Sequence, residues 1–195
     1  MKVYKLNLIG ITGLIGSGKT TVGNIIQELG YIVFDMDKWC AKLYKNPKFL
    51  SVIEKNFPTS FENGIFYKKK LRNIVFSNKE ALQTLEKLTH PYLKKQLLNL
   101  IHKNRFNNHL FFIETALLYQ MNLDNFFNHI IITEAPYDII LKRTIKRDNI
   151  TKQEFENIIK RQNVDLLKNK YAYKINTNQS LARLKTTVIQ LIERM

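Results

Sequence analysis

The segment that decides the fold is Leu8-Ile9-Gly10-Ile11-Thr12-Gly13-Leu14-Ile15-Gly16-Ser17-Gly18-Lys19-Thr20-Thr21. An apolar run over residues 6–11 leads directly into the pattern Gly-x-x-x-x-Gly-Lys-Thr, which spans Gly13 to Thr20. Apolar residues then recur with the spacing of one helix face, at Val22, Ile25, Ile26 and Leu29. A strand, a glycine-rich loop and a helix in this order are typical of a phosphate-binding loop. The segment therefore predicts that the protein binds a nucleotide.

The residue types of this loop suit the oxygens of a triphosphate. Its glycines allow the backbone N–H groups of residues 14–20 to converge on one anion. The following helix adds the positive end of its dipole at the same point. Lys19 can reach the outer phosphates, and the Thr20 hydroxyl can ligate Mg²⁺. The predicted nucleotide-binding residues of the loop are Gly13, Leu14, Ile15, Gly16, Ser17, Gly18, Lys19, Thr20 and Thr21.

Length and composition indicate one globular domain. The chain has 195 residues, of which 45% are hydrophobic and 24% are charged. No apolar run approaches the roughly 20 residues that cross a bilayer, and the N-terminus has no signal-peptide pattern. The single Cys40 excludes an internal disulfide, and the four scattered histidines form no zinc-like pattern. We therefore expect a cytoplasmic protein without a membrane partner, present as a monomer or weak homo-oligomer.

The formal net charge of +15 can be explained in two ways. It can attract nucleic acid or a polyanionic small molecule. It can also reflect composition alone, because the lysines are dispersed over a chain rich in Lys, Asn and Ile. The charge alone does not decide between them; the partner that we predict is a small-molecule substrate and not a nucleic acid.

Acidic residues follow two further strands of the predicted sheet. Residues 31–34 form a short apolar strand that ends in Asp35-Met36-Asp37, and residues 109–114 form another that ends in Glu114. Open α/β sheets bind their ligands at the carboxyl ends of the strands. Either aspartate could instead cap a helix over residues 38–44, and Glu114 could be an ordinary strand-end charge rather than a group that holds Mg²⁺ or its water. Two more strands are predicted at residues 130–133 and, weakly, at 173–175.

The region from about residue 38 to 105 has amphipathic helical segments and no clear buried strand. The segments cover residues 49–57, 69–76, 79–88 and 91–101. Such a long helical stretch between two strands predicts an inserted lobe. His90-Pro91 fits a helix start with proline at the first helical position. For His90, a capping or packing role and a substrate contact both remain open.

Two short basic helices near the C-terminal third suit a flap over phosphates. Residues 136–147 form a helix on which Arg143 and Arg147 share a face, as do Lys142 and Lys146. Thr151-x-x-Glu154 is a capping box for a helix that reaches about Gln162. Arginine grips phosphoryl oxygens in a planar, bidentate manner, although a solvated basic face is the alternative. An amphipathic helix over residues 181–192 is expected to close the chain.

Together these features resemble the dephospho-CoA kinase family, which phosphorylates the ribose 3′-hydroxyl of dephospho-CoA. The resemblance runs through most of the chain. The matching residues are the loop from Ile11 to Thr21, Asp35-x-Asp37, Leu71-Arg72-x-Ile74-Val75-Phe76, His90-Pro91, Arg143-x-x-x-Arg147-Asp148, Thr151, Glu154 and Gln162. The chain departs from the usual family pattern at Leu14, Tyr67, Ala116 and Thr177.

The resemblance implies an α/β, three-layer P-loop NTPase fold with a parallel sheet, similar to the nucleoside monophosphate kinases. The core would comprise residues of about 1–37, 106–135 and 166–195. A helical substrate lobe would cover about 38–105 and a helical lid about 136–165. The whole chain, 1–195, would then be a single kinase domain.

The resemblance also implies transfer of the ATP γ-phosphoryl group to a sugar hydroxyl of dephospho-CoA, with Mg²⁺ as cofactor. It favours Asp37 as the catalytic base and gives catalytic roles to Lys19 and Arg143. Its further expected assignments are ATP binding by Arg143 and Arg147, substrate binding by Asp37, Arg72 and His90, and Mg²⁺ at Thr20 and Glu114. Another small P-loop kinase for nucleosides or nucleoside monophosphates, and a nucleotide-dependent switch or nucleic-acid ATPase, are the alternatives.

Overall fold

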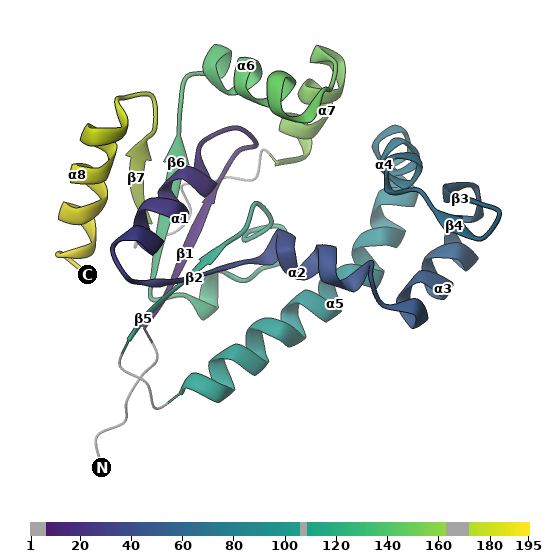
Figure 1. Cartoon of the computed structure of the whole chain (residues 1–195), viewed down its shortest axis with the longest axis horizontal. Helices are drawn as coiled ribbons and strands as arrows, with labels where there is room; N and C mark the ends of the chain where they lie inside the picture. The colour runs from purple at the N-terminus through teal and green to yellow at the C-terminus, as the bar shows by residue number, and fades with distance from the viewer. Residues whose placement is uncertain (1–6, 106–108, 163–171) are drawn as a thin grey trace. The chain divides into compact units, whose positions relative to one another are not determined.

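The computed structural model describes residues 7–105, 109–162 and 172–195 (Figure 1). It divides into two compact units, one of residues 1–35 with 104–195 and one of residues 36–103. Residue 6 of the apolar run predicted to form the first strand, and residues 163–171, which include the end of the predicted lid, lie outside the described residues. The two units are described separately below.

The first unit is built on a five-stranded parallel sheet. Its strands are β1 (Asn7–Gly13), β2 (Ile32–Asp35), β5 (Leu110–Glu114), β6 (His129–Glu134) and β7 (Ala172–Asn176). They lie in the order β2-β5-β1-β6-β7, and every neighbouring pair is parallel. The predicted parallel sheet is therefore confirmed, including the weak last strand. The register pairs Gly13 with Thr133 and Asp35 with Glu114, so the strand ends that carry polar residues share one edge.

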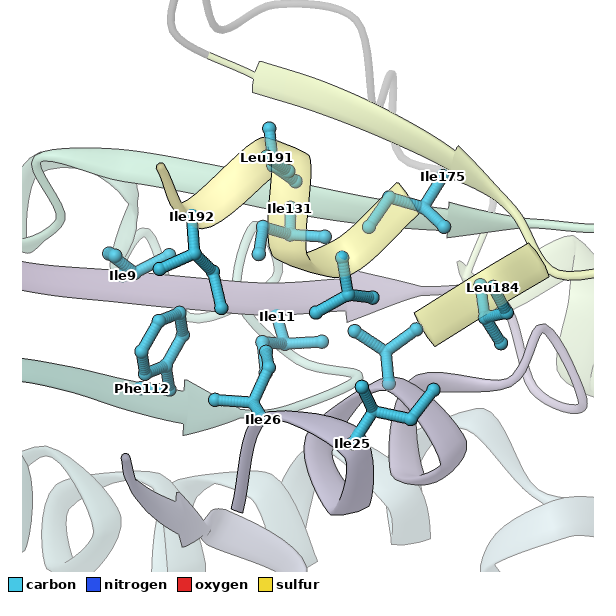
Figure 2. Close-up of a cluster of buried hydrophobic side chains, with 12 residues drawn as sticks. Ile9, Ile11, Ile25, Ile26, Phe112, Ile131, Ile175, Leu184, Leu191 and Ile192 are labelled. Carbon is cyan, nitrogen blue, oxygen red and sulfur yellow. The ribbon is translucent and has the colours of Figure 1, made fainter. Parts of the chain in front are cut away.

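Two helices cover one face of this sheet and form a hydrophobic core with it. They are α1 (Lys19–Glu28) and α8 (Leu181–Ile192). Figure 2 shows their apolar side chains meeting those of the strands. The buried residues of this cluster are Ile9, Ile11, Val22, Ile25, Ile26, Phe112, Ile131, Ile175, Leu184, Val188, Leu191 and Ile192. Each large apolar side chain buried in this way contributes roughly 1.5–3 kcal/mol, so the core fixes α1 beneath the loop that precedes it.

The predicted lid helices are α6 (Tyr137–Asp148) and α7 (Lys152–Gln162). Asn149 ends α6 with a left-handed φ of 50°. The capping box predicted at the start of α7 is confirmed, because Thr151 N donates to Glu154 Oε2 at 2.7 Å and Glu154 N donates to Thr151 Oγ1 at 3.2 Å. Residues within the short turn therefore determine where α6 ends and where α7 begins.

The second unit is mainly helical. It contains α2 (Met36–Leu43), α3 (Pro47–Asn56), the 3-10 turn η1 (Pro58–Ser60), a small hairpin of β3 (Phe61–Glu62) and β4 (Ile65–Phe66), α4 (Lys68–Ser77) and α5 (Lys79–Asn104). Its buried core consists of Ile53, Phe57, Leu71 and Val75. Asn63 and Gly64 both have positive φ, as a tight hairpin turn requires.

One sequence expectation in this unit is wrong. His90-Pro91 does not begin a helix, because α5 runs for 26 residues with Pro91 inside it. Thr89, Leu93 and Leu97 are buried on both sides of the proline, and their packing outweighs the backbone hydrogen bond that proline lacks. Of the two aspartates that could cap the next helix, Asp37 lies within the first turn of α2, whereas Asp35 directly precedes it.

Candidate active site

The glycine-rich loop joins the end of β1 to the start of α1 and packs tightly against α6. Gly16 has a φ of +74°, and a Cβ placed there would lie 2.4 Å from Thr144 Oγ1 and 2.7 Å from the Ile140 carbonyl oxygen. A side chain at this position would be strained by the backbone and would collide with the helix. The close approach of loop and lid helix therefore requires glycine.

The Lys19 ammonium lies over the start of the loop. Its Nζ atom donates hydrogen bonds of 3.0 Å to the carbonyl oxygens of Gly13 and Leu14. These bonds hold a positive charge beside the backbone amides of the loop, which carry partial positive charge themselves. The arrangement favours a multiply charged anion at this point.

Threonine side chains from two strand ends support the loop. Thr133 Oγ1, at the end of β6, lies 2.6 Å from Ser17 Oγ, and it donates to the Thr12 carbonyl oxygen at 3.2 Å. Thr177, directly after β7, donates its hydroxyl hydrogen to the Ser17 carbonyl oxygen at 2.8 Å. Ser17, Thr133 and Thr177 are all buried, so these bonds are shielded from competing water.

The side-chain oxygens of Thr20 and Glu114 meet beside the loop. Thr20 Oγ1 donates to Glu114 Oε1 at 2.6 Å, and Asp35 is the register partner of Glu114 on the neighbouring strand. A hydroxyl and carboxylates are the hard oxygen donors that Mg²⁺ prefers, usually together with substrate phosphates and water rather than a complete protein cage. Among the described residues there is no group of three or more His, Cys, Asp or Glu that could hold a metal ion. The residues fit the predicted cofactor.

The three lid side chains differ in what they contact. Arg143 donates from Nη1 to Thr177 Oγ1 at 3.0 Å and from Nη2 to the Thr177 carbonyl oxygen at 3.1 Å. Gln162, at the end of α7, accepts a 2.8 Å hydrogen bond from Ile15 N in the loop. Arg147 makes a bidentate pair with the adjacent Asp148, with both distances 2.8 Å. Arg143 and Gln162 therefore tie the lid helices to the loop region.

The predicted substrate-binding residues belong to the second unit. Asp37 is exposed in the first turn of α2, one turn before Cys40. Burial raises the pKa of the Cys40 thiol, and the Asp37 charge raises it further. Arg72 lies over the Phe76 ring, with 5.2 Å between the guanidinium carbon and the ring centroid. Burial lowers the pKa of His90, and nearby Glu86 acts in the opposite direction.

A cavity of about 430 Å³ borders the loop at the carboxyl edge of the sheet. Its lining residues are Leu14, Ser17, Thr133, Glu134, Ala135, Pro136, Ile140 and Asn176. Both polar and apolar groups therefore face this space beside the phosphate-binding loop.

Sequence reasoning missed the roles of Thr133 and Thr177 and did not give Gln162 a contact. Both threonines stand at the carboxyl end of a predicted strand, which is a signal for a ligand-binding edge. Their hydroxyl contacts span more than 100 residues of sequence, with separations of 116 and 160 residues. A local pattern cannot supply the partner of such a side chain.

The parallel sheet, the Gly-x-x-x-x-Gly-Lys-Thr loop between its central strand and α1, and lid side chains bonded near that loop define a P-loop kinase. Across the described residues, no helix has the length and apolarity that a membrane crossing needs. The chain belongs to the dephospho-CoA kinase family, whose sequence model matches residues 7–183.

Individual relatives agree with this assignment. A dephospho-CoA kinase of Bartonella henselae is 32% identical over 97% of this chain and 98% of its own length. That of Aquifex aeolicus is 35% identical over 96% of both chains. The solved structure of dephospho-CoA kinase from Campylobacter jejuni has a TM-score of 0.66 and 27% identity, covering 96% of each chain.

Proposed function

We propose that this protein transfers the γ-phosphoryl group of ATP to the ribose 3′-hydroxyl of dephospho-CoA, which yields CoA and ADP in the last step of coenzyme A biosynthesis. The observation that carries the proposal is the family match over residues 7–183 on a chain whose phosphate loop is complete from Gly13 to Thr20. A new bond forms between the acceptor oxygen and the phosphorus, and the bond between that phosphorus and the ADP oxygen breaks.

The chain's own contribution to this step is electrostatic. The transferring group spreads negative charge over its oxygens, and fixed donors stabilise that charge better than mobile water does. Lys19 and the loop amides supply positive charge on one side of the nucleotide. Arg143 supplies a second cation, held by Thr177. Arg147, which is the more exposed member of its pair with Asp148, would join it when that pair opens.

Thr20 and Glu114 would hold Mg²⁺, which neutralises charge on the phosphate oxygens when it is bound. Asp37 would accept the proton of the acceptor hydroxyl, since it is a carboxylate on the helix that follows the ligand-binding end of β2. We further propose that the unit of residues 36–103, with Arg72 and His90, receives dephospho-CoA. The cytoplasmic location and the monomeric or weakly oligomeric state expected from the sequence stay predictions.

A coupled ADP-release assay tests the proposal. The purified full chain is given ATP, Mg²⁺ and one acceptor from dephospho-CoA, adenosine, AMP and RNA. We expect saturable ADP release with dephospho-CoA alone and the appearance of CoA by mass spectrometry. Lys19→Ala should lower this rate by roughly 10²-fold or more. Equal ADP release without any acceptor, or stimulation by RNA, would refute the proposed acceptor.

A further inference from the structure

Thr177 bonds to two groups that the proposed reaction needs. Its hydroxyl donates to the Ser17 carbonyl oxygen of the phosphate loop at 2.8 Å. The same hydroxyl accepts from Arg143 Nη1 at 3.0 Å, while the Thr177 carbonyl oxygen accepts from Arg143 Nη2 at 3.1 Å. Thr177, which directly follows β7, therefore links the phosphate loop to Arg143 of α6.

Chemistry fixes the direction of these bonds. A hydroxyl has one hydrogen to donate, and an arginine side chain can only donate. The Thr177 hydrogen therefore goes to Ser17, and the oxygen lone pairs face Arg143. Such a chain of hydrogen bonds strengthens each member, and more so where water is excluded. Thr177 is only 4% exposed.

The position of Thr177 is itself constrained on two sides. Its backbone nitrogen donates to the Glu134 carbonyl oxygen at 2.8 Å, which continues the pairing of β6 and β7. Gly18 has a φ of +93°, and a Cβ there would lie 2.9 Å from the Thr177 side chain. Strand pairing and the loop glycine therefore leave Thr177 little room to move, whereas Arg143 is a long side chain on an exposed helix face.

We propose that Thr177 is a positioning residue that acts through Arg143. By holding two guanidinium nitrogens, it fixes the arginine beside the loop before the nucleotide binds, so that less side-chain entropy is lost on binding. The inference rests on the proposed function for the role of Arg143 in phosphoryl transfer. The expected effect of Thr177 on ATP affinity requires only that the loop binds ATP.

Matched variants test this role. Thr177→Val keeps the shape and removes the hydroxyl, whereas Thr177→Ser keeps the hydroxyl. We expect Thr177→Val to weaken Mg-ATP binding about 5- to 10-fold in calorimetric titration and to raise the KM for ATP by a similar factor. Thr177→Ser should stay within about 2-fold of the original protein. If Thr177→Val binds ATP as tightly as the original protein, the proposal is overturned.

A double-mutant cycle separates positioning from mere support of the loop. In an Arg143→Ala background, Thr177→Val should cost much less than in the original protein, because the part of its effect that passes through the arginine is already lost and only the bond to Ser17 remains. Thr133→Val is the control, since Thr133 also bonds to Ser17 but on the β6 side, and its effect should add to that of Arg143→Ala. A full additive effect of Thr177→Val in that background would refute action through Arg143.

A second variant keeps the inference testable if Thr177→Val does not fold. Arg143→Lys retains the charge but lacks the planar fork that bonds to Thr177 from two separate nitrogens, so it should show a similar loss of ATP affinity. Affinity equal to that of the original protein would overturn the proposal. If the unmodified protein releases no ADP with dephospho-CoA, the proposed acceptor is wrong, and the ATP titrations still decide the role of Thr177.

Discussion

The Gln162 side chain accepts a 2.8 Å hydrogen bond from the backbone nitrogen of Ile15, a residue 147 positions earlier in the chain. The bond joins the last residue of α7 to the phosphate loop. It places a lid side chain on one of the loop amides. The end of α7 is therefore linked directly to the phosphate loop through the side-chain amide of Gln162.

We predict that Gln162→Met, which has similar size but no acceptor in that position, lowers kcat about 3- to 10-fold. One intramolecular hydrogen bond contributes about 0.5–1.5 kcal/mol, and its loss leaves the Ile15 amide without this partner. Steady-state kinetics with saturating substrates measure the effect. Gln153→Met is the control, because Gln153 lies at the exposed start of the same helix and bonds only weakly to Asn157. Equal kcat values for the two variants would contradict the coupling.

The pair of Thr20 and Glu114 leads to a prediction about Mg²⁺. Glu114→Gln removes a charge from a buried group that accepts a 2.6 Å hydrogen bond. The Mg²⁺ concentration for half-maximal activity should rise at least about 10-fold, because carboxylate charge sets much of the affinity for a hard cation. Titration of Mg²⁺ at fixed ATP measures it. Glu28→Gln on the exposed face of α1 should leave the midpoint unchanged, and an unchanged midpoint for Glu114→Gln would remove that residue from the metal site.

Asp37 is predicted to act on catalysis rather than on ATP binding. Asp37→Asn keeps size and removes the basic oxygen, so kcat should fall by roughly 10²-fold or more with little change in the KM for ATP. Asp35→Asn is the comparison, since Asp35 ends β2 two residues earlier and pairs in register with Glu114. If Asp35→Asn abolishes turnover while Asp37→Asn keeps the original kcat, the base is the other aspartate.

His90 gives a pH-dependent stability. Burial lowers its pKa from the ordinary value of 6.5, so below that pH the unfolded chain binds the proton more readily than the folded chain. The free energy of unfolding should therefore fall as the pH falls through 6.5 towards the folded pKa. His90→Gln should weaken this fall, as measured by urea unfolding at pH 8 and pH 5.5. Glu86→Gln should make it steeper, because the Glu86 charge raises the pKa of His90; parallel curves for all three proteins would exclude the effect.

The sequence predicted the sheet and the loop well because their signals are local. The apolar runs of β1, β5 and β6 are buried as expected of central parallel strands. The capping box at Thr151 depends on a residue three positions away, so it is visible in sequence. The supports of the loop are different, since the partners of Thr177 and Gln162 are set by tertiary structure. Such contacts cannot be found from spacing along one chain.

The helix start predicted at Pro91 is wrong for the opposite reason. A strong local sequence signal is outweighed there by the packing of buried side chains. Proline after a possible cap is common at helix starts, yet Leu93 and Leu97 continue the buried face of α5 through it. Because proline has no N–H, α5 lacks one backbone hydrogen bond at this exposed position. The helix keeps the proline at a cost in stability that a substitution can measure.

Pro91→Ala should therefore stabilise the protein. Alanine is about 3 kcal/mol more favourable than proline inside a helix, and the greater freedom of the unfolded chain offsets about 0.4–1 kcal/mol of this. A net gain of about 2 kcal/mol corresponds to a rise in Tm of roughly 4–8 °C for a chain of this size. Thermal unfolding followed by circular dichroism of the helices measures this rise. Gln83→Ala, at another exposed position of α5, serves as the control and should change Tm by less than about 2 °C, since glutamine and alanine differ little in helix propensity. A lower Tm for Pro91→Ala would show that the hydrogen bond missing at Pro91 does not cost the folded protein stability.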